Sequence, residues 1–289
     1  MAPAVSYLRV RILVTNDDGV HASGLAALAR SLAAWAAGGG EDRQVVVVAP
    51  LENHSGASAA VGTVYERDSI AYRKVVIEGA EAIPTYGLDA SPALSVIVGA
   101  LGAFGPRPDI VVSGINAGVN VGRSVLHSGT VGAVLTGAQL GLNGLAVSLR
   151  SGGVVNHWET AADLAVGLVE ALDEAPAGTV WNLNVPSLAP EELLGLRLGR
   201  ISNAGIIKSA SETVRVEPDH PSGDGAIRLT LGAAVPSLGD VRDEAPEDDG
   251  ALVAAGYASL TPIVGVRADT SAEAQALVTT VLAGLEPRR

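Results

Sequence analysis

The chain has 289 residues, 48% of them hydrophobic, and a formal net charge of −12 at pH 7. This length and apolar content favour one large α/β domain with a sizeable core over several small domains. The acidic balance argues against binding a nucleic-acid polymer, which needs a basic surface to displace counterions, and the absence of cysteine excludes disulfides, thiol nucleophiles and zinc–thiolate sites. Because neither a signal-peptide pattern nor a membrane-length apolar run is apparent, we expect a soluble cytoplasmic protein.

The first predicted element is a strand over residues 10–14, which runs into the acidic turn Asn-Asp-Asp-Gly at 16–19. Its near-continuous apolar run is typical of a strand buried on both faces of a parallel sheet. Asp17 and Asp18 are adjacent carboxylates that raise each other's pKa, and a divalent cation removes that cost. Oxygen ligands of this kind suit Mg²⁺ or Mn²⁺. These residues alone leave two interpretations open, a metal site and an ordinary polar turn.

Helix and strand signals then alternate along the chain. Leucines at helical spacing after Ser23 predict a helix that ends at the glycines 38–40, and residues 44–50 form a second apolar strand. This β–α–β order predicts a right-handed parallel crossover. The later predicted elements are short antiparallel strands within 60–88, helices over 91–101, 131–140 and 157–172, and strands over 109–112, 144–149 and 179–185.

The α/β alternation fades near residue 195, so we divide the chain into a core over 1–195 and an extension over 196–289 of the same domain. The extension contains strand-like pieces at 196–201, 226–231 and 257–264, an acidic segment at 240–250 interpreted as a solvated loop, and a terminal helix over 271–285. The strand pieces have no obvious place in the core sheet. Since unpaired strand edges favour association, we expect a homo-oligomer of at least two chains.

Polar clusters follow three of the predicted strands, at 16–19, 53–58 and 113–120. They are rich in Asn, Ser, Asp and Gly. Parallel strands place these clusters at one edge of the sheet, where open α/β sheets bind ligands. The pattern predicts a site built from short oxygen ligands and exposed backbone.

A fourth polar stretch, 128–130 (Ser-Gly-Thr), begins a predicted helix. Hydroxyls and free N–H groups at a helix start suit an anion, although plain N-capping is an equally good interpretation. The glycines at 114, 118 and 122 do not match G-x-G-x-x-G, so a dinucleotide fingerprint is absent. No G-x-S-x-G elbow occurs either, which argues against a serine hydrolase.

The sequence resembles the SurE family, the survival-protein 5′-nucleotidases, in four stretches: RILVTNDDGVHASG (11–24), NHSGAS (53–58), RPDIVVSGINAGVNVG (107–122) and LHSGTVGA (126–133). The resemblance extends in order along essentially the whole chain. It implies a Rossmann-like, largely parallel sheet with helices on both faces, plus a C-terminal extension of β-hairpin and helix used for contacts between subunits. It also implies a metal-dependent hydrolase that releases phosphate from nucleoside 5′-monophosphates, as a homodimer or homotetramer.

The resemblance assigns roles to particular residues. It places the metal ligands at Asp17, Asp18, Ser55 and Asn116, with Asp17, Asp18 and Asn116 also catalytic. It places phosphate and substrate binding at Asn16, Ser58, Asn120, Ser128, Gly129 and Thr130. Attack by a metal-activated water and an aspartyl-phosphate on Asp17 both stay open. His127 either protonates the leaving alkoxide or orients its loop.

Two stretches depart from the family pattern. SurE proteins commonly carry Thr-Pro-x-Asp-Cys before the third strand, where this chain has Gly-Leu-Asp-Ala-Ser-Pro at 87–92. Leu51 and Glu52 stand where the family often has Asp-Arg. These departures bear on substrate recognition more than on catalysis. Two alternative functions stay open, a non-catalytic nucleotide-binding regulator and a phosphatase for a non-nucleotide monoester.

Overall fold

The structure is a computed structural model that describes residues 10–39, 42–62, 64, 68–151, 155–203 and 245–285. Its strands are β1 (Val10–Thr15), β2 (Arg43–Pro50), β3 (Tyr72–Val75), β4 (Thr85–Leu88), β5 (Ile110–Ala117), β6 (Asn143–Leu149), β7 (Val180–Val185), β8 (Leu196–Leu198) and β9 (Ala258–Ile263). Within the described ranges they form one sheet in the order β3-β4-β2-β1-β5-β6-β7-β9-β8.

The centre of the sheet is parallel, from β4 through β2, β1, β5 and β6 to β7. β3 pairs antiparallel with β4 at one edge, as the mixed composition of residues 60–88 predicts. After β2 is placed on one side of β1, the chain continues on the other side with β5, so the strand order reverses between β1 and β5. Such a switch point opens a crevice at the carboxyl ends of the strands.

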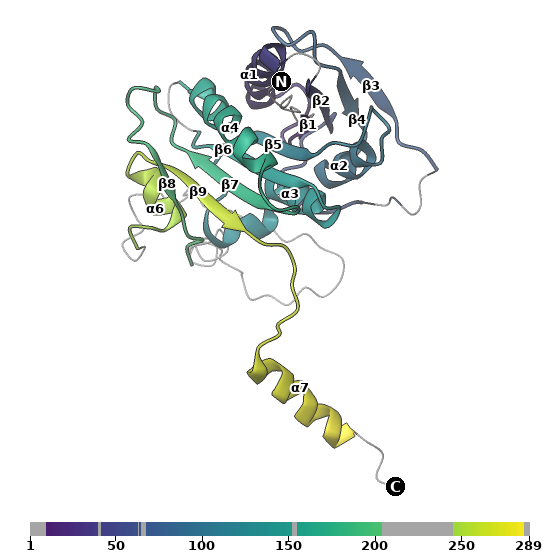
Figure 1. The fold of residues 1–289 in the computed structure, drawn as a ribbon, viewed down its shortest axis with the longest axis vertical. Coiled ribbons are helices and arrows are strands. Elements are labelled where there is room, and N and C mark those ends of the chain that lie inside the picture. Colours follow the sequence, from purple (N-terminus) through teal and green to yellow (C-terminus); the bar gives the residue numbers. More distant parts are fainter. Residues whose placement is uncertain are drawn as a thin grey trace, which may run out of the picture.

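Helices cover both faces of the sheet (Figure 1). They are α1 (Ser23–Gly39), α2 (Pro92–Ala100), α3 (Gly129–Gln139), α4 (Trp158–Asp173), α6 (Asp249–Ala254) and α7 (Ala272–Leu285), with a 3₁₀ helix η3 (Gly122–His127) before α3. On β1, Ile12 and Val14 pack with α1 and α4, whereas Leu13 packs with α2 and α3. This double burial explains the unbroken apolar run and confirms the predicted α/β architecture.

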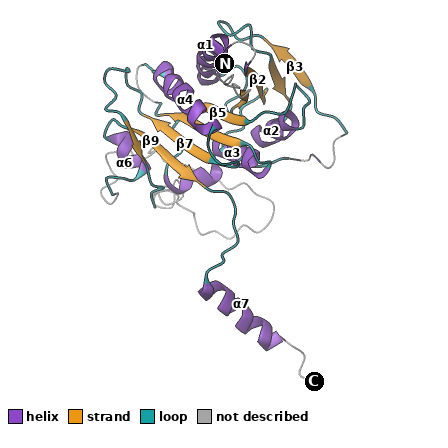
Figure 2. Cartoon of the chain, viewed as in Figure 1, coloured by secondary structure: helices purple, strands orange, loops and turns teal. Residues whose placement is uncertain are grey.

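The C-terminal part is partly integrated into the sheet. β9 pairs antiparallel with β7 and parallel with β8, so the expectation that these strand pieces have no place in the core sheet is wrong. The predicted strand at 226–231 lies outside the described residues. The predicted terminal helix is α7, which extends away from the sheet and its covering helices (Figure 2).

The interpretation of residues 240–250 as a solvated loop is wrong at its end, where residues 248–250 are buried, whereas Pro246 and Glu247 are exposed as predicted. Asp248 is 6% exposed and Asp249 is 0% exposed. Their carboxylates are compensated inside the fold: Oδ1 of Asp248 accepts a hydrogen bond from Nη2 of Arg200 over 2.9 Å, and Asp249 accepts from main-chain N–H groups. Residues 240–244 lie outside the described residues.

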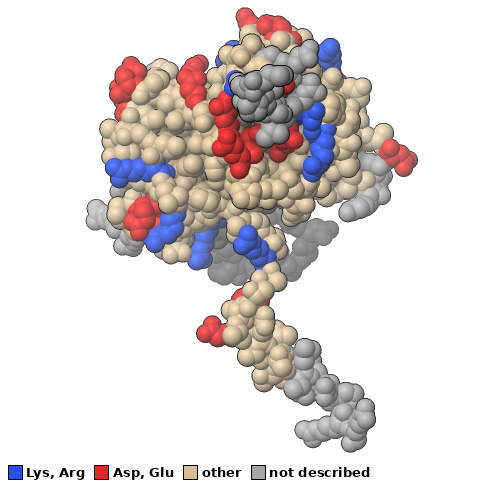
Figure 3. Space-filling view, viewed as in Figure 1, with Lys and Arg blue, Asp and Glu red and all other residues tan. Residues whose placement is uncertain are grey.

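Two surface properties agree with the composition. On the face drawn in Figure 3, Lys and Arg are scattered among acidic and uncharged residues and form no broad basic patch. Among the described helices, none combines the length and apolar character needed to cross a bilayer.

Candidate metal and phosphate site

The segments that carry the predicted metal ligands lie at the carboxyl ends of β1, β2 and β5, and hydrogen bonds connect them. The N–H of His54 donates to the main-chain oxygen of Asp17 over 2.7 Å, which fixes the loop after β2 to the turn after β1. The N–H of Ala117 donates to Oδ2 of Asp18 over 3.1 Å, which fixes the same turn to the end of β5. The structure thus brings the three polar strand ends to one edge of the sheet.

The Asp17 side chain is buried and hydrogen-bonded. It is 3% exposed, and its Oδ1 accepts a hydrogen bond from the Thr130 hydroxyl over 2.7 Å. Burial, and to a smaller extent the neighbouring charge of Asp18, raise the pKa of Asp17 above its usual range, and the Thr130 hydrogen bond offsets part of this rise. A cation beside this carboxylate would favour its ionised form.

The start of α3 lies directly against Asp17. A Cβ atom on Gly129 would lie 2.7 Å from Cβ of Asp17 and 2.9 Å from its Oδ2, so only glycine allows this approach. Oγ of Ser128 accepts a hydrogen bond from the N–H of Val131 over 3.1 Å and caps the helix. Ser128 therefore has the capping role, while Gly129 and Thr130 hold the carboxylate at the positive end of α3.

Ser58 is engaged with the main chain. Its hydroxyl donates to the oxygen of Leu126 over 2.7 Å and its N–H donates to the oxygen of His127 over 3.2 Å. A Cβ on Gly132 would lie 2.3 Å from the main-chain oxygen of Ser58, so the loop after β2 packs closely on α3. These contacts place Ser58 beside η3 as a support of the predicted phosphate loop.

The two predicted asparagines near the carboxyl end of β5, Asn116 within the strand and Asn120 after it, differ in their surroundings. Nδ2 of Asn116 donates to the oxygen of Gly118 over 2.7 Å, which orients the amide and leaves Oδ1 as the atom suited to a cation. Asn120 is buried: its Nδ2 donates to Oγ of Ser148 over 2.8 Å, and its N–H donates to Oδ1 of Asn184 over 2.7 Å. Asn120 therefore anchors its loop to β6 and β7.

Sequence reasoning missed the supporting role of β7. Nδ2 of Asn182 and Nδ2 of Asn184 both donate to the main-chain oxygen of Asn120, over 2.8 and 3.0 Å. Both asparagines are fully buried. Two buried asparagines spaced by two residues lie on the same face of a strand, and this spacing was the available signal.

The donor set fits a hard divalent cation. Oδ1 of Asn16 is buried without a hydrogen-bond partner, while Nδ2 of the same side chain donates to the oxygen of Gly19 over 2.9 Å. A nearby positive charge would stabilise both the unpaired Oδ1 of Asn16 and the buried carboxylate of Asp17, which lies next to that of Asp18. Among the described residues, no group of three or more His, Cys, Asp or Glu side chains is placed to hold a metal ion, and the candidate set here combines two carboxylates with neutral hydroxyl and amide oxygens.

The rim of this edge is open to solvent. Ser55 is exposed, and its N–H donates to Oδ1 of Asn53 over 2.7 Å, which shapes the loop that presents the hydroxyl. His127 is also exposed, at the end of η3. A substrate can therefore approach the buried carboxylate from this side.

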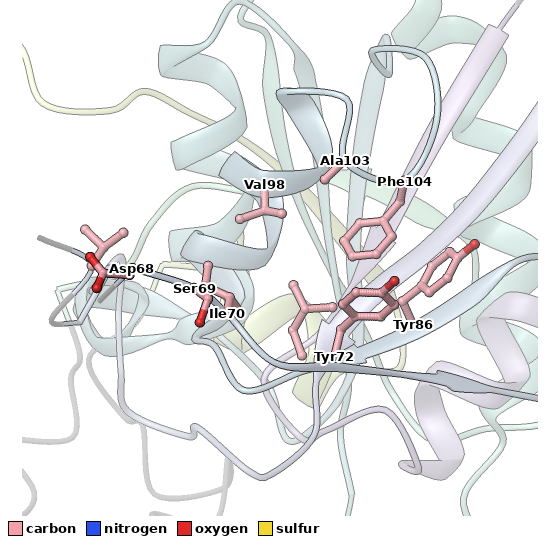
Figure 4. A pocket seen from close by; sticks show the side chains of 10 residues that line it. Asp68, Ser69, Ile70, Tyr72, Tyr86, Val98, Ala103 and Phe104 are labelled. Atoms are coloured by element: carbon pink, nitrogen blue, oxygen red, sulfur yellow. The ribbon is translucent and has the colours of Figure 1, made fainter. Parts of the chain in front are cut away.

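A cavity of about 480 Å³ lies elsewhere, among β3, β4 and the end of α2 (Figure 4). The ring of Phe104 stacks on Tyr86 with centroids 4.4 Å apart and meets Tyr72 edge-on at 5.3 Å. None of the predicted metal or phosphate residues lines it. Because its lining is mainly apolar and includes the carboxylate Asp68, it is unsuited to a phosphate.

The chain matches a known protein family over most of its length. A family model described as Survival protein SurE matches residues 12–207, more than half of the chain. The chain belongs to the SurE family. A 5′/3′-nucleotidase SurE of Cronobacter sakazakii is 38% identical over 256 residues, which cover 88% of this chain and 90% of the relative. A SurE relative of the same name from Photorhabdus laumondii is 39% identical over 280 residues, 96% of this chain and 98% of its own.

The fold comparison gives the same family. The crystal structure of the SurE protein from Aquifex aeolicus superposes with a TM-score of 0.68 at 26% sequence identity. The match covers 94% of this chain and 99% of that one. The SurE resemblance drawn from the motifs is thereby confirmed, together with the predicted fold class.

Thr130→Val is expected to lower kcat/KM of this SurE chain about tenfold, because a buried carboxylate loses a charge-assisted hydrogen bond. Thr130→Ser is the matched control, since it retains the hydroxyl that donates to Asp17. Steady-state kinetics with saturating Mn²⁺ test this expectation. Equal kcat/KM values for the two variants would contradict the role of the Thr130 hydroxyl.

Proposed function

We propose that this chain is a divalent-metal-dependent phosphomonoester hydrolase that releases phosphate from nucleoside monophosphates. The observation that carries the proposal is the buried carboxylate of Asp17, held beside Asp18 and against the first turn of α3. The relatives named 5′/3′-nucleotidase SurE support a substrate range of 5′- and 3′-monophosphates, wider than the 5′ specificity predicted from the sequence. The expected cytoplasmic location stays a prediction.

The proposed ligands of Mg²⁺ or Mn²⁺ are Asp17, Asp18, Ser55 and Asn116. A bound divalent cation supplies a Lewis acid for the phosphoryl oxygen and lowers the pKa of a coordinated water. The N–H groups and hydroxyls at the start of α3 offer partners for the phosphate oxygens, because a helix N-terminus attracts anions.

Of the two chemical routes, we place attack by water first. Oδ1 of Asp17 accepts the Thr130 hydrogen bond, and Asp17 is itself a proposed metal ligand, so its carboxylate is engaged in binding the cation and not free to attack phosphorus. His127 is exposed on the same rim and is proposed as the group that protonates the leaving alkoxide.

The test is phosphate release from a panel of nucleoside 5′-monophosphates, nucleoside 3′-monophosphates and sugar phosphates. Each substrate is assayed with Mg²⁺, with Mn²⁺ and with excess EDTA. Metal-dependent release from the nucleotides is the expected result. Binding of nucleotides without release would make the chain a regulator, and release from sugar phosphates alone would make it a different phosphatase; either result would overturn the proposal.

The same proposal includes a homo-oligomer, dimer or tetramer, with α7 as a contact. Leu277, Val278 and Val281 are 68%, 56% and 54% exposed on this helix, and the helix extends from the rest of the molecule (Figure 1). Exposed apolar side chains at helical spacing favour burial against a partner.

Leu277→Lys is expected to reduce the molar mass in solution, because it places a charge on the apolar face of α7. Thr279→Lys, which adds the same charge on the opposite face, is expected to leave the mass unchanged. Size-exclusion chromatography with light scattering measures both. A wild-type monomer at micromolar concentration would contradict oligomerisation.

A further inference from the structure

Asp249 is a fully buried carboxylate outside the set of predicted site residues. It is the first residue of α6 and is 0% exposed. Its Oδ1 and Oδ2 accept hydrogen bonds from the N–H of Gly122 over 3.1 and 2.9 Å. Oδ1 also accepts from the N–H of Ser202 over 3.3 Å and from that of Gly250 over 2.9 Å. Burying a carboxylate is costly unless it is hydrogen-bonded in this way.

The partner Gly122 lies in the predicted phosphate region. It follows Asn120 by two residues and begins η3, which runs directly into Ser128 and the start of α3. Its φ of +57° is a left-handed conformation that favours glycine. The position of η3, and with it the entry to α3, therefore depends on a carboxylate contributed by the C-terminal part of the chain.

The position of Asp249 is set independently of this loop. Its N–H donates to the oxygen of Arg200 over 2.8 Å, and the N–H of Arg200 donates to the oxygen of Glu247 over 3.0 Å. The two chain segments that flank residues 204–244 are thereby joined, and Asp249 projects from this joined base toward Gly122.

Asn120 is held separately, by Asn184 and Ser148 of the sheet. The upstream half of the loop thus has its own anchor. Asp249 anchors the downstream half of this loop, which runs from Gly122 through η3 to the start of α3.

We propose that Asp249 is a positioning residue of the phosphate site. It acts through Gly122, holding η3 so that Ser128, Gly129 and Thr130 keep their place at the start of α3. Phosphate binding then depends on the C-terminal part of the chain. Asp17 is connected to this first turn through the Thr130 hydroxyl, so the effect of Asp249 on the metal ligands is indirect and smaller. The inference rests on the proposed function, since it assigns phosphate to the start of α3.

The test compares Asp249→Asn with Asp248→Asn in the full-length chain. In Asp249→Asn, the carboxylate that accepts the hydrogen bonds of the Gly122 N–H is replaced by an amide. The NH₂ group of that amide is itself a donor, so it cannot accept a hydrogen bond from a main-chain N–H. In Asp248→Asn, an adjacent carboxylate that pairs with Arg200 instead is removed. Measurements are KM and kcat for a nucleoside monophosphate, the inhibition constant of inorganic phosphate, and Mn²⁺ affinity by calorimetry.

The expected result for Asp249→Asn is a rise of about tenfold in KM and in the phosphate inhibition constant, with a smaller loss of Mn²⁺ affinity, as for loss of a charge-assisted hydrogen bond. Asp248→Asn is expected to keep all these values within about twofold of wild type. KM and phosphate inhibition equal in the two variants would overturn the proposal. So would an equal loss of Mn²⁺ affinity, which would mean a general disturbance of the site.

Asp249→Ser, which keeps one acceptor oxygen, is the second variant if Asp249→Asn does not fold. Should neither fold, Asp249 is a folding determinant and the positioning role is overturned. If the wild type hydrolyses no nucleotide, the proposed function fails on its own. Calorimetric titration with inorganic phosphate in the presence of Mn²⁺ then still compares the variants directly.

Discussion

Asp17→Asn is expected to lower the rate of phosphate release with Mn²⁺ by about a hundredfold or more, while the chain stays folded. The substitution keeps the size of the side chain and leaves an oxygen to accept the Thr130 hydrogen bond, but it removes one of two adjacent negative charges. Weaker metal binding lowers both phosphoryl polarisation and water activation, which together contribute several kcal/mol. Initial rates and Mn²⁺ affinity measure the effect, and near-normal turnover would contradict the proposed metal site.

The same variant has an expected effect on stability without metal. Because the pKa of Asp17 in the fold is above its unfolded value, the stability present at low pH is lost as pH rises through the folded pKa. Asparagine does not ionise, so the thermal midpoint of Asp17→Asn in EDTA should equal or exceed that of wild type at pH 7. The difference should shrink at acid pH, where Asp17 is protonated.

The matched control for both measurements is Asp163→Asn. Asp163 is exposed on α4, far along the chain from the site, so its charge is solvated. The phosphate-release rate and the thermal midpoint of Asp163→Asn should stay close to those of wild type. A midpoint in EDTA at pH 7 that is lower for Asp17→Asn than for Asp163→Asn would contradict the unfavourable burial of the Asp17 charge.

Gly129→Ala is expected to lower kcat/KM about a hundredfold through steric displacement. The new Cβ would lie 2.7 Å from Cβ and 2.9 Å from Oδ2 of Asp17, so the carboxylate or the first turn of α3 must move. A misplacement of about 1 Å at a catalytic group can cost a hundredfold in rate. The overpacking should also lower the free energy of unfolding by about 1–3 kcal/mol.

Gly167→Ala supplies the matched glycine control. Gly167 lies inside α4, and a Cβ there would meet nothing within 4 Å. Alanine favours a helix over glycine, so this variant should gain up to about 1 kcal/mol and keep its kcat/KM. Similar kinetics for the two variants would mean that Asp17 tolerates the displacement and that close approach at Gly129 has no catalytic importance.

The core of the fold was predictable because strands buried on both faces consist almost entirely of apolar residues. Residues 10–14 and 44–50 are apolar throughout, and in the structure both faces of β1 are covered. The place of β9 was not predictable in this way. Residues 257–264 have the composition of a strand, but the partner β7 is separated from them by most of the C-terminal part of the chain, and no local pattern encodes that pairing.

The residues of the site can be divided in the same way, into those that the sequence indicated and those that only the fold revealed. Asp17 and Asp18 stand out in sequence, because paired carboxylates after an apolar run need a physical reason. The hydrogen bond from Thr130 to Asp17 and the burial of Asp249 did not stand out. A run of acidic residues such as 243–249 suggests solvent when only composition is considered. The burial of Asp249 depends on N–H donors from Gly122 and Ser202, which only the folded chain brings together.

The contacts that hold Asp17 and Asp18 also determine when this site can form during folding. Thr130 lies 113 residues from Asp17 in the chain, and Ala117 lies 99 residues from Asp18. Closing such long loops carries an entropic cost that is recovered only when β1, β5 and α3 have docked. A metal ion therefore finds its ligands assembled late, so added Mn²⁺ should slow unfolding of the chain and leave its folding rate almost unchanged.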